Sequence, residues 1–275
     1  MSCTPRVKIF YKKTKIKCYN IHGDIMIKFT WYGTFSIKLE TNKSKILIDP
    51  FIRYEKRNEK DFKDNFYNVK DIFITHGHLD HTMDLHDLYS DKNVIIHTTN
   101  TVYNRLIKEG FDDNNLCKIN YDDEYSIDDI NIKVIHGKHI KFDLKLILKT
   151  IFNKNLIIYH KNLIPLIKAH LKCKENKETV NYYITINNKK FLFMGSMALN
   201  NNSIYPKNID YLVLAYQGRS DLDKKIDSII NTIKPKKIIL AHFDNSFPPI
   251  SSDVDISKLK YKNIIIPEYE KEIEL

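Results

Sequence analysis

Long apolar runs are absent from this chain of 275 residues. No stretch of about eighteen uncharged apolar residues occurs in it, so the sequence predicts no membrane-spanning helix. Residues 1–20 also mix lysine and arginine among their apolar side chains, and they lack the continuous apolar centre of a secretory signal. The simplest expectation is therefore a cytoplasmic protein.

Cysteine is scarce as well. The four cysteines, Cys3, Cys18, Cys117 and Cys173, lie far apart, and no Cys-x-x-Cys pair occurs. This spacing excludes a zinc ribbon and a disulfide framework, so we expect free thiols. Internal repeats and low-complexity linkers are lacking too, and a hydrophobic content of 43% is enough for a large core. We expect one domain over residues 1–275.

Positive charge, in contrast, is in excess. The formal net charge is +10 and the isoelectric point is near 9.1, and a positive field attracts anionic partners. The lysines are nevertheless spread along the whole chain, often beside asparagine and isoleucine. That distribution indicates a biased amino-acid supply and a solvated surface, so we do not expect nucleic acid as the partner.

Short apolar runs typical of β-strands recur along the chain and predict extensive sheet. Tyr32 and Gly33 separate the first two runs, and Asn187 and Asn188 separate a later pair, so each pair is expected to form an antiparallel hairpin. The runs are Ile25–Trp31, Phe35–Leu39, Ile46–Ile48, Ile72–Ile74, Val94–Ile96, Ile130–Ile135, Tyr182–Ile186, Phe191–Met194, Tyr211–Ala215, Ile238–Leu240 and Ile264–Ile266.

Helices are predicted between some of these strands. Asn100 can cap a helix that Gly110 closes, and Asp221 can begin another that continues to Thr232. Hairpins followed by alternating strands and helices are typical of a layered fold that mixes helix and sheet. The expected class is therefore α/β in the broad sense that includes α+β.

Residues 142–180 interrupt the strand pattern with a lysine-studded apolar stretch. Leu163, Leu166, Ile167 and Leu171 fit one face of a helix. Two interpretations stay open at this point. The stretch can be a helical insertion packed on the core, or it can be a lid or lipid-facing element beside a functional site, which would make a membrane contact.

Residues 75–81 read Thr-His-Gly-His-Leu-Asp-His and follow the apolar run that ends at Ile74. They place three imidazoles and a carboxylate within six positions. Imidazole nitrogen and carboxylate oxygen suit a borderline cation such as zinc, and a loop after a strand presents its side chains at the rim of a sheet. The pattern predicts a metal-dependent hydrolase, and a surface loop that is merely rich in histidine is the alternative.

The His-x-His-x-Asp-His pattern of residues 76–81 resembles the metallo-β-lactamase superfamily. Further matches are residues 46–50, where Ile-Leu-Ile ends in Asp-Pro, and the positions of His139, Gly195-Ser196 and His242. The resemblance spans most of the chain. It implies a four-layer αββα sandwich, in which two central sheets lie between outer helices and the metal site lies on the edge that the sheets share.

Two divalent ions are implied by the same resemblance, with zinc favoured and iron or manganese as alternatives. The implied ligand sets are His76, His78 and His139 on one ion, and Asp80, His81 and His242 on the other. Asp80 is also the implied catalytic residue, because it would orient the attacking water. His136 follows the same strand as His139, and we prefer His139 as the ligand and His136 as a supporting group.

Ser196 departs from the commoner pattern of that family, in which an aspartate at this position bridges both ions. A neutral hydroxyl is a poor ligand, so the second ion is expected to bind less firmly. Asp49 and Ser196 are both expected to support the ligands. Residues 216–220 and the His-x-Asp-x-x-Phe-x-Pro pattern at 242–249 resemble bacterial members of undefined substrate, and in these segments Arg219 and Asp244 are candidates for substrate contact.

The expected reaction is hydrolysis by a metal-bound hydroxide, acting on a small-molecule or lipid-like ester, amide or phosphodiester. A nuclease of the same superfamily is one alternative, although residues 142–180 are too short for a large substrate-binding domain. A metal-binding sensor with little turnover is another, and Ser196 favours it. An antibiotic-degrading lactamase is disfavoured by the lack of an export signal. The sequence does not predict an oligomeric state.

Overall fold

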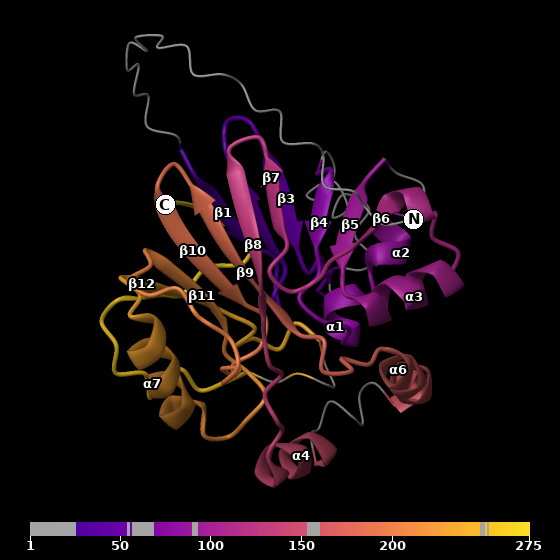
Figure 1. The fold of residues 1–275 in the computed structure, drawn as a ribbon. Helices are drawn as coiled ribbons and strands as arrows, with labels where there is room; N and C mark the ends of the chain where they lie inside the picture. Colours follow the sequence, from indigo (N-terminus) through magenta and orange to yellow (C-terminus); the bar gives the residue numbers. More distant parts are fainter. Residues whose placement is uncertain are drawn as a thin grey trace.

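Two seven-stranded sheets packed face to face form the centre of the molecule (Figure 1). The computed structural model describes residues 26–53, 56, 69–89, 93–152, 160–247, 251 and 253–275. In order across the first sheet the strands are β14 (Glu272–Glu274), β1 (Lys28–Trp31), β2 (Ile37–Glu40), β3 (Lys45–Ile48), β4 (Asp71–Phe73), β5 (Ile95–Thr98) and β6 (Leu116–Lys118). Across the second they are β13 (Ile264–Ile265), β12 (Lys237–Ala241), β11 (Tyr211–Ala215), β10 (Lys189–Met194), β9 (Val180–Ile186), β8 (Ile130–His136) and β7 (Glu124–Ile127).

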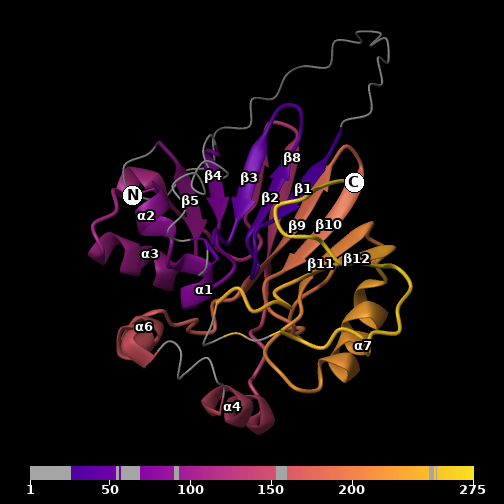
Figure 2. The same ribbon diagram turned by 180° about the vertical axis from the view of Figure 1, so that it is seen from behind.

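Helices cover the outer face of each sheet. On the first sheet lie α2 (Leu85–Tyr89) and α3 (Asn100–Lys108), and on the second lies α7 (Leu222–Ile233). The short helix α1 (Leu79–Thr82) lies at one end of the sandwich (Figure 1), where Leu79 packs with Phe51, Cys173 and Phe247. Two further helices, α4 (Leu144–Ile151) and α6 (His160–Lys172), project from one end of the sandwich (Figures 1 and 2). A short 3₁₀ turn, η3 (Asp113–Asn115), precedes β6. The αββα architecture predicted from the sequence is confirmed.

Alternation along the strands explains the layers. In β10, Phe191 and Phe193 face the central core between the sheets, while Leu192 and Met194 face the outer core under α7. Successive side chains of a strand point to opposite faces, so a strand that is apolar at every position must be covered on both sides. The continuous apolar runs of the sequence are therefore the central strands of the sandwich.

Both sheets combine antiparallel and parallel pairing. β1, β2 and β3 are antiparallel to one another, and β3, β4, β5 and β6 are parallel. Likewise β7 to β10 are antiparallel, whereas β10 to β13 are parallel. The expected hairpins at Gly33 and at Asn187-Asn188 are thus confirmed. Parallel strands bring their carboxyl ends to one edge of a sheet, and loops that follow such ends commonly carry function.

Three strands were not expected from the sequence: β6, β7 and β14. All three lie at the edge of a sheet and are short. In β7 the side chains alternate between exposed and half-buried, and β14 reads Glu-Ile-Glu. An edge strand needs little apolar surface because one side of it faces solvent. A search for apolar runs therefore finds the interior of each sheet but only one of the four edge strands, β13.

Cys117 and Cys173 are buried free thiols, as expected, while Cys3 and Cys18 lie outside the described residues. Within the described part of the chain, none of the helices has the length and apolar character that crossing a membrane requires. The described residues between 142 and 180 include the helices α4 and α6 and lead into β9.

Tyr182 links the two sheets through a buried hydrogen bond. Its hydroxyl, on β9, donates to the carbonyl oxygen of Ile74 at the end of β4, with 2.6 Å between the oxygens. We expect Tyr182→Phe to lower the free energy of unfolding by about 1–2 kcal/mol, because the Ile74 carbonyl then stays buried without this donor. Urea denaturation measures the loss. The matched change Tyr183→Phe, on the same strand and only partly buried, should cost less than about 0.5 kcal/mol; equal effects would refute the assigned link.

Candidate metal centre

The histidine-rich loop begins where β4 ends and continues into α1. His76 and His78 lie in the loop, and Asp80 and His81 lie in the first turn of the helix. Gly77 lets the loop pass closely over the chain that follows α6, since a Cβ at this position would lie 2.2 Å from the carbonyl oxygen of Lys174. The spacing of the motif is thus set by a tight loop that only glycine fits.

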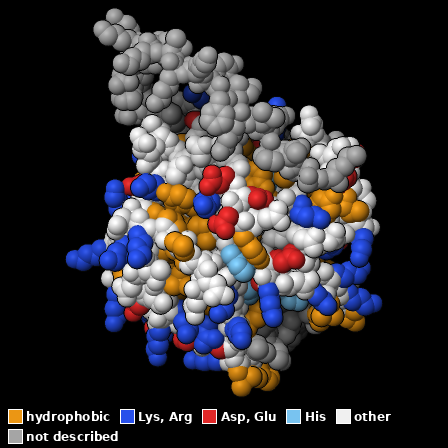
Figure 3. Space-filling view, in the orientation of Figure 1, with side chains coloured by type: hydrophobic (Ala, Val, Ile, Leu, Met, Phe, Trp, Pro, Cys, Tyr) orange, Lys and Arg blue, Asp and Glu red, His pale blue; other side chains and the backbone are white. Residues whose placement is uncertain are grey.

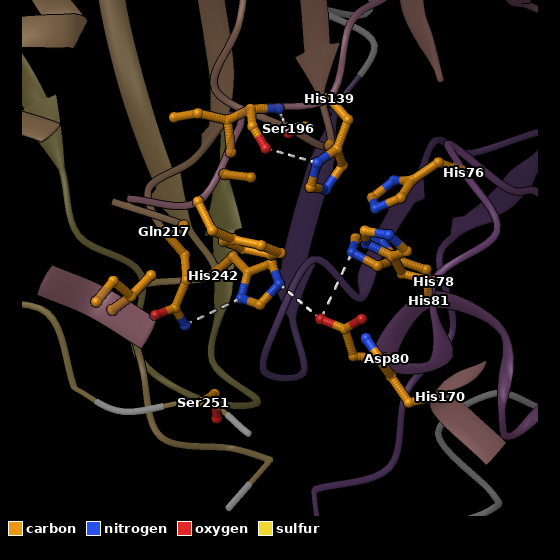
Figure 4. A pocket seen from close by; sticks show the side chains of 16 residues that line it. His76, His78, Asp80, His81, His139, His170, Ser196, Gln217, His242 and Ser251 are labelled. Carbon is orange, nitrogen blue, oxygen red and sulfur yellow. Dashed lines mark hydrogen bonds and ion pairs between the residues drawn. The ribbon is translucent and has the colours of Figure 1, made fainter. Parts of the chain in front are cut away.

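His76, His78 and His139 form the first group of candidate ligands. Each offers one ring nitrogen, and these nitrogens lie within 4.8 Å of one another. The ring centroids of His78 and His139 are 4.4 Å apart, and that of His76 is 4.9 Å from His139. The structure therefore brings His139, from the loop after β8, to the two histidines that follow β4 (Figure 4).

Asp80, His81 and His242 form the second group, with ligand atoms again within 4.8 Å. Oδ2 of Asp80 lies 2.9 Å from Nε2 of His242 and 3.7 Å from Nε2 of His81. His242 follows β12 with a left-handed backbone at φ 56°, and its N–H donates to the carbonyl of Thr34. A non-glycine residue in that region is strained by roughly 1–2 kcal/mol, as is frequent at functional sites.

Hydrogen bonds fix the tautomers of His76 and His139. The hydroxyl of Thr75 donates to the carboxylate of Asp49, so its oxygen accepts from Nδ1 of His76 at 3.0 Å. Nδ1 of His139 donates to the carbonyl of Ile140 at 2.7 Å. A neutral imidazole carries one proton, so each Nε2 is left with a lone pair. Nε2 of His76 is buried without a hydrogen-bond partner, which fits a metal ion, because buried polar atoms are otherwise paired.

Asp49 performs the same role for His81. Nδ1 of His81 donates to Oδ2 of Asp49 at 2.6 Å, and Oδ1 accepts from the backbone N–H of Thr75 at 2.7 Å. The fully buried Asp49 thus orients one candidate ligand directly and the loop of His76 through Thr75. On His242, the amide nitrogen of Gln217 lies 3.4 Å from Nδ1, and turning this amide over would place its oxygen there as an acceptor for the ring N–H. Carboxylate and carbonyl partners of this kind raise the basicity of ligating imidazoles.

Burial and mutual repulsion keep the first group neutral. Burial lowers the pKa of His76 well below its ordinary value, and the neighbouring imidazoles lower it further. Burial likewise lowers the pKa of His139 and lowers that of His78 to about 3. Neutral imidazoles are the form that binds metal, so no proton has to be displaced from these rings at neutral pH.

The second group behaves differently because it contains carboxylates. Burial alone would raise the pKa of Asp80, but His81 and His242 outweigh burial and hold that pKa below its ordinary value. Burial also opposes the charge on His81, yet the carboxylates of Asp49 and Asp80 raise its pKa. Asp80 is therefore an anion at neutral pH, and its charge would attract a dication at this position.

Ser196 follows β10 and lies against the loop of His139. Its hydroxyl oxygen accepts from the backbone N–H of Ile140 at 2.9 Å, and Ile140 is the same residue whose carbonyl fixes His139. Gly195 is required here, since a Cβ would lie 2.3 Å from the hydroxyl oxygen of Thr75. Ser196 thus holds the loop of a candidate ligand, and its supporting role at a metal centre stays a prediction.

A cavity of about 260 Å³ opens over both groups. One wall is apolar and consists of Ile140, Phe142, Leu146 and Ala215, while Gln217 and Ser251 add polar atoms. His170, on α6, also lines the cavity, with its ring centroid 5.9 Å from that of His78. Of these residues only Gln217, in the segment 216–220, belongs to a pattern noted in the sequence, so the tertiary structure alone brings the others, His170 included, to the site.

His136 lies outside this cluster. Its ring stacks on Tyr121, with centroids 3.7 Å apart and an angle of 17° between the planes, and it does not line the cavity. His136 is the last residue of β8, where the side chain still follows the alternation of the strand. The two positions proposed as alternatives from the sequence therefore have different surroundings, and only His139 lies beside His76 and His78.

The two candidates for substrate contact also lie away from the cavity wall. Arg219 pairs with Asp221, its Nε 2.5 Å from the carboxylate, and donates to the carbonyl of Lys141. Asp244 is buried and accepts from the backbone N–H of Thr34 at 3.3 Å, and burial raises its pKa to about 6. Both side chains connect loops around the site, and neither of them lines the cavity.

The depressed pKa of His78 predicts how the metal-free protein titrates. In chelator-treated protein we expect no protonation of His78 between pH 8 and about pH 4, because burial holds its pKa near 3. In urea the same ring should titrate near pH 6.5. The neutral ring contributes stability above pH 6.5 that is lost as the pH falls toward the folded pKa. NMR of the ring protons, assigned with His78→Gln, measures this, and a midpoint near 6.5 in the folded protein would contradict it.

Sequence comparisons agree with this geometry. A profile described as the metallo-beta-lactamase superfamily matches residues 29–148. The chain is 26% identical over 258 residues to a UPF0173 metal-dependent hydrolase of Oenococcus oeni, an alignment that covers 90% of this chain and all of the relative. It is 37% identical over 71 residues to a UPF0173 metal-dependent hydrolase of Rhizobium johnstonii, covering 26% of this chain and 30% of that protein.

Solved structures share the fold. A metallo hydrolase from the archaeon Ignicoccus hospitalis superimposes with a TM-score of 0.56 at 15% sequence identity, over 91% of this chain and 98% of the other. Similarity at this identity concerns the architecture alone. The chain is thus similar to the metallo-β-lactamase superfamily over residues 29–148 and to a metal-dependent hydrolase along most of its length, and it shares the fold of a solved metallo hydrolase.

Proposed function

We propose that the chain is a metal-dependent hydrolase with a dinuclear site, and that water ionised by the metals is its nucleophile. The observation that carries this proposal is the pair of ligand groups on one cavity, His76, His78 and His139 beside Asp80, His81 and His242. Three of these imidazoles have Nδ1 bonded to an acceptor, so Nε2 is left for an ion. The name metal-dependent hydrolase given to the relative in Oenococcus oeni supports the same reaction class.

Zinc is the ion that we propose, because imidazole and carboxylate donors suit it, although iron and manganese accept the same donors. When bound, such ions lower the pKa of water toward about 7 and polarise an oxygen of the substrate. Side chains of the protein orient the attacking water and the ligands. Asp80 stays ionised and can accept a hydrogen bond from the attacking water, and Asp49 and Thr75 hold the histidines in place.

The shape of the cavity suggests the kind of substrate. The ligand groups and Gln217 are polar, whereas Ile140, Phe142 and Leu146 form an apolar wall beside them. A molecule with a hydrolysable ester, amide or phosphodiester next to an apolar group fits this cavity. Its polar group would face the ligand groups and Gln217, and its apolar group would face the apolar wall. We therefore propose a small-molecule or lipid-like substrate.

A metal-binding sensor with little turnover is the second candidate. Ser196 supplies no carboxylate between the two groups, and its hydroxyl oxygen is engaged by the N–H of Ile140. The second ion would then depend on Asp80, His81 and His242 alone. An ion that binds less firmly can be exchanged with the surroundings, as a sensor requires.

Metal content and turnover test the proposal together. Zinc-loaded protein is expected to hold about two equivalents and to hydrolyse at least one of a set of chromogenic esters, phosphodiesters and lactams. His139→Ala should lose one equivalent and lower kcat/KM by at least about 1,000-fold, because the first ion loses a ligand. His136→Ala is the matched control and should keep both properties, since that ring stacks on Tyr121.

Each other outcome of this experiment has a defined meaning. A full metal load without turnover of any substrate class would favour the sensor. Cleavage of RNA that His139→Ala abolishes would favour a nuclease. Metal retained by His139→Ala and lost by His136→Ala would overturn the assignment of the first group.

Asp49→Asn tests the buried carboxylate separately. An amide cannot accept from Thr75 and His81 at both oxygens, so we expect the affinity of the second metal to fall by about 10- to 100-fold. Isothermal titration with zinc measures this change. Asp71→Asn is the matched control, because Asp71 pairs with His97 at 2.8 Å outside the metal centre; a similar loss of zinc affinity in both variants would show a general loss of stability instead.

A further inference from the structure

Exposed apolar side chains gather on the two projecting helices. Of the twelve large hydrophobic residues that are exposed in the described part of the chain, seven lie between residues 142 and 171. These are Phe142, Leu144, Leu148, Phe152, Ile164, Ile167 and Leu171. The other five are scattered singly over the sequence. A contiguous group of this kind marks an interaction surface, whereas single exposed apolar residues are ordinary.

On α4 the exposed residues form a stripe. Leu144, Leu148 and Phe152 follow one another at intervals of four, and Leu144 and Phe152 are 71% and 80% exposed. Residues four apart lie on one side of a helix. Leu146, two positions from the stripe, lines the cavity instead. The helix therefore presents one apolar side to the cavity and a second apolar side to solvent.

On α6 the arrangement is similar. Ile164, Ile167 and Leu171 are spaced as i, i+3 and i+7, which again places them on one side of the helix, and all three are exposed. His170 lines the cavity. The face expected from the sequence included Leu163 and Leu166, whose side chains lie outside the described residues. Ile167 and Leu171, which shared that expected face, are turned outward.

Charge is concentrated on the same segment. From Leu144 to Lys174 the sequence contains seven lysines and no aspartate or glutamate, whereas the whole chain has a net charge of only +10. Residues 1–23 hold six lysines and arginines without an acid, so the remainder of the chain is slightly acidic at −3. Outside these two segments, acids accompany the lysines. Lys145, Lys168 and Lys172 are exposed beside the stripes.

Both helices lie at the end of the sandwich where α1 carries the metal ligands, and they extend beyond it (Figures 1 and 2). In Figure 3, hydrophobic side chains reach the surface at the lower edge of the molecule, with lysine and arginine side chains beside them. From the stripes, the charge and this position we propose that α4 and α6 dock on an anionic phospholipid surface, with the apolar stripes inserted and the lysines on the headgroups.

Other occupants fit these features less well. A second copy of the chain on this face would bring two segments of charge +7 together, and like charges oppose such an interface. A nucleic acid would neutralise the lysines and leave Leu144 and Phe152 in water. A bilayer with acidic headgroups satisfies both kinds of side chain. If the proposed hydrolase activity holds, the apolar wall of Phe142 and Leu146 would receive an amphipathic substrate from that surface.

Vesicle sedimentation with the zinc-loaded full chain tests the docking surface without reference to turnover. We expect binding to vesicles of phosphatidylcholine and phosphatidylglycerol, roughly 2:1, that falls when salt is raised or when phosphatidylglycerol is omitted. The double variant Leu144→Ser and Phe152→Ser should bind at least about tenfold more weakly. Ile204→Ser is the control, because Ile204 is 94% exposed and belongs to neither helix, and it should bind like the unmodified protein.

A second pair of changes, Lys145→Gln and Lys168→Gln, addresses the charge and keeps the apolar stripes. It should weaken binding to the acidic vesicles by about tenfold. Unmodified protein that stays in the supernatant, or serine variants that sediment as well as it does, would overturn the proposal. So would light scattering that shows a dimer dissociated by the serine changes, which would assign the face to self-association. Loss of hydrolysis with binding intact would affect only the proposed function.

Discussion

The buried carboxylate of Asp49 is the interaction on which the site depends. It accepts three hydrogen bonds, two from Thr75 and one from His81, and it is inaccessible to solvent. A buried carboxylate is stable only when donors surround it, so its ionised form fixes the positions of those donors. Through Thr75 it sets the ring of His76, and through His81 it sets the second ligand group. One anion thus orders ligands of both proposed ions.

That order exists only when the two sheets are packed together. His76, His78 and His81 follow β4 in the first sheet, whereas His139 and His242 follow β8 and β12 in the second. The hydrogen bond of Tyr182 to Ile74 and that of the His242 backbone to Thr34 join the sheets beside the ligands. Neither sheet alone therefore supplies all three residues of either proposed ligand group. The energy of metal binding is therefore linked to the packing of the sandwich.

The features that could be predicted from the sequence are those that have a local signal in it. Apolar runs located the central strands because those are covered on both faces, but the edge strands β6, β7 and β14 carry no such signal. The histidine motif indicated four candidate ligands within residues 76–81. Side-chain directions, in contrast, appear only in three dimensions. They decide that His139 and not His136 joins the histidine cluster, and that Arg219 and Asp244 contact loops instead of the cavity. His170 lines the cavity from α6, in a segment for which the sequence left open both packing on the core and a lid or lipid-facing element beside the site.

The helices α4 and α6 illustrate a conflict between stability and function. Leu144 and Phe152 are exposed in the folded protein, as they are in the unfolded chain. Because folding does not bury them, they contribute nothing to the free energy of folding. Charged residues at those positions would make the protein more soluble without changing the cavity. Their apolar character is therefore unexplained by the fold and requires a partner that covers them. The seven lysines and missing acids of the same segment restrict that partner to an anionic one, and a lipid surface meets both conditions at once.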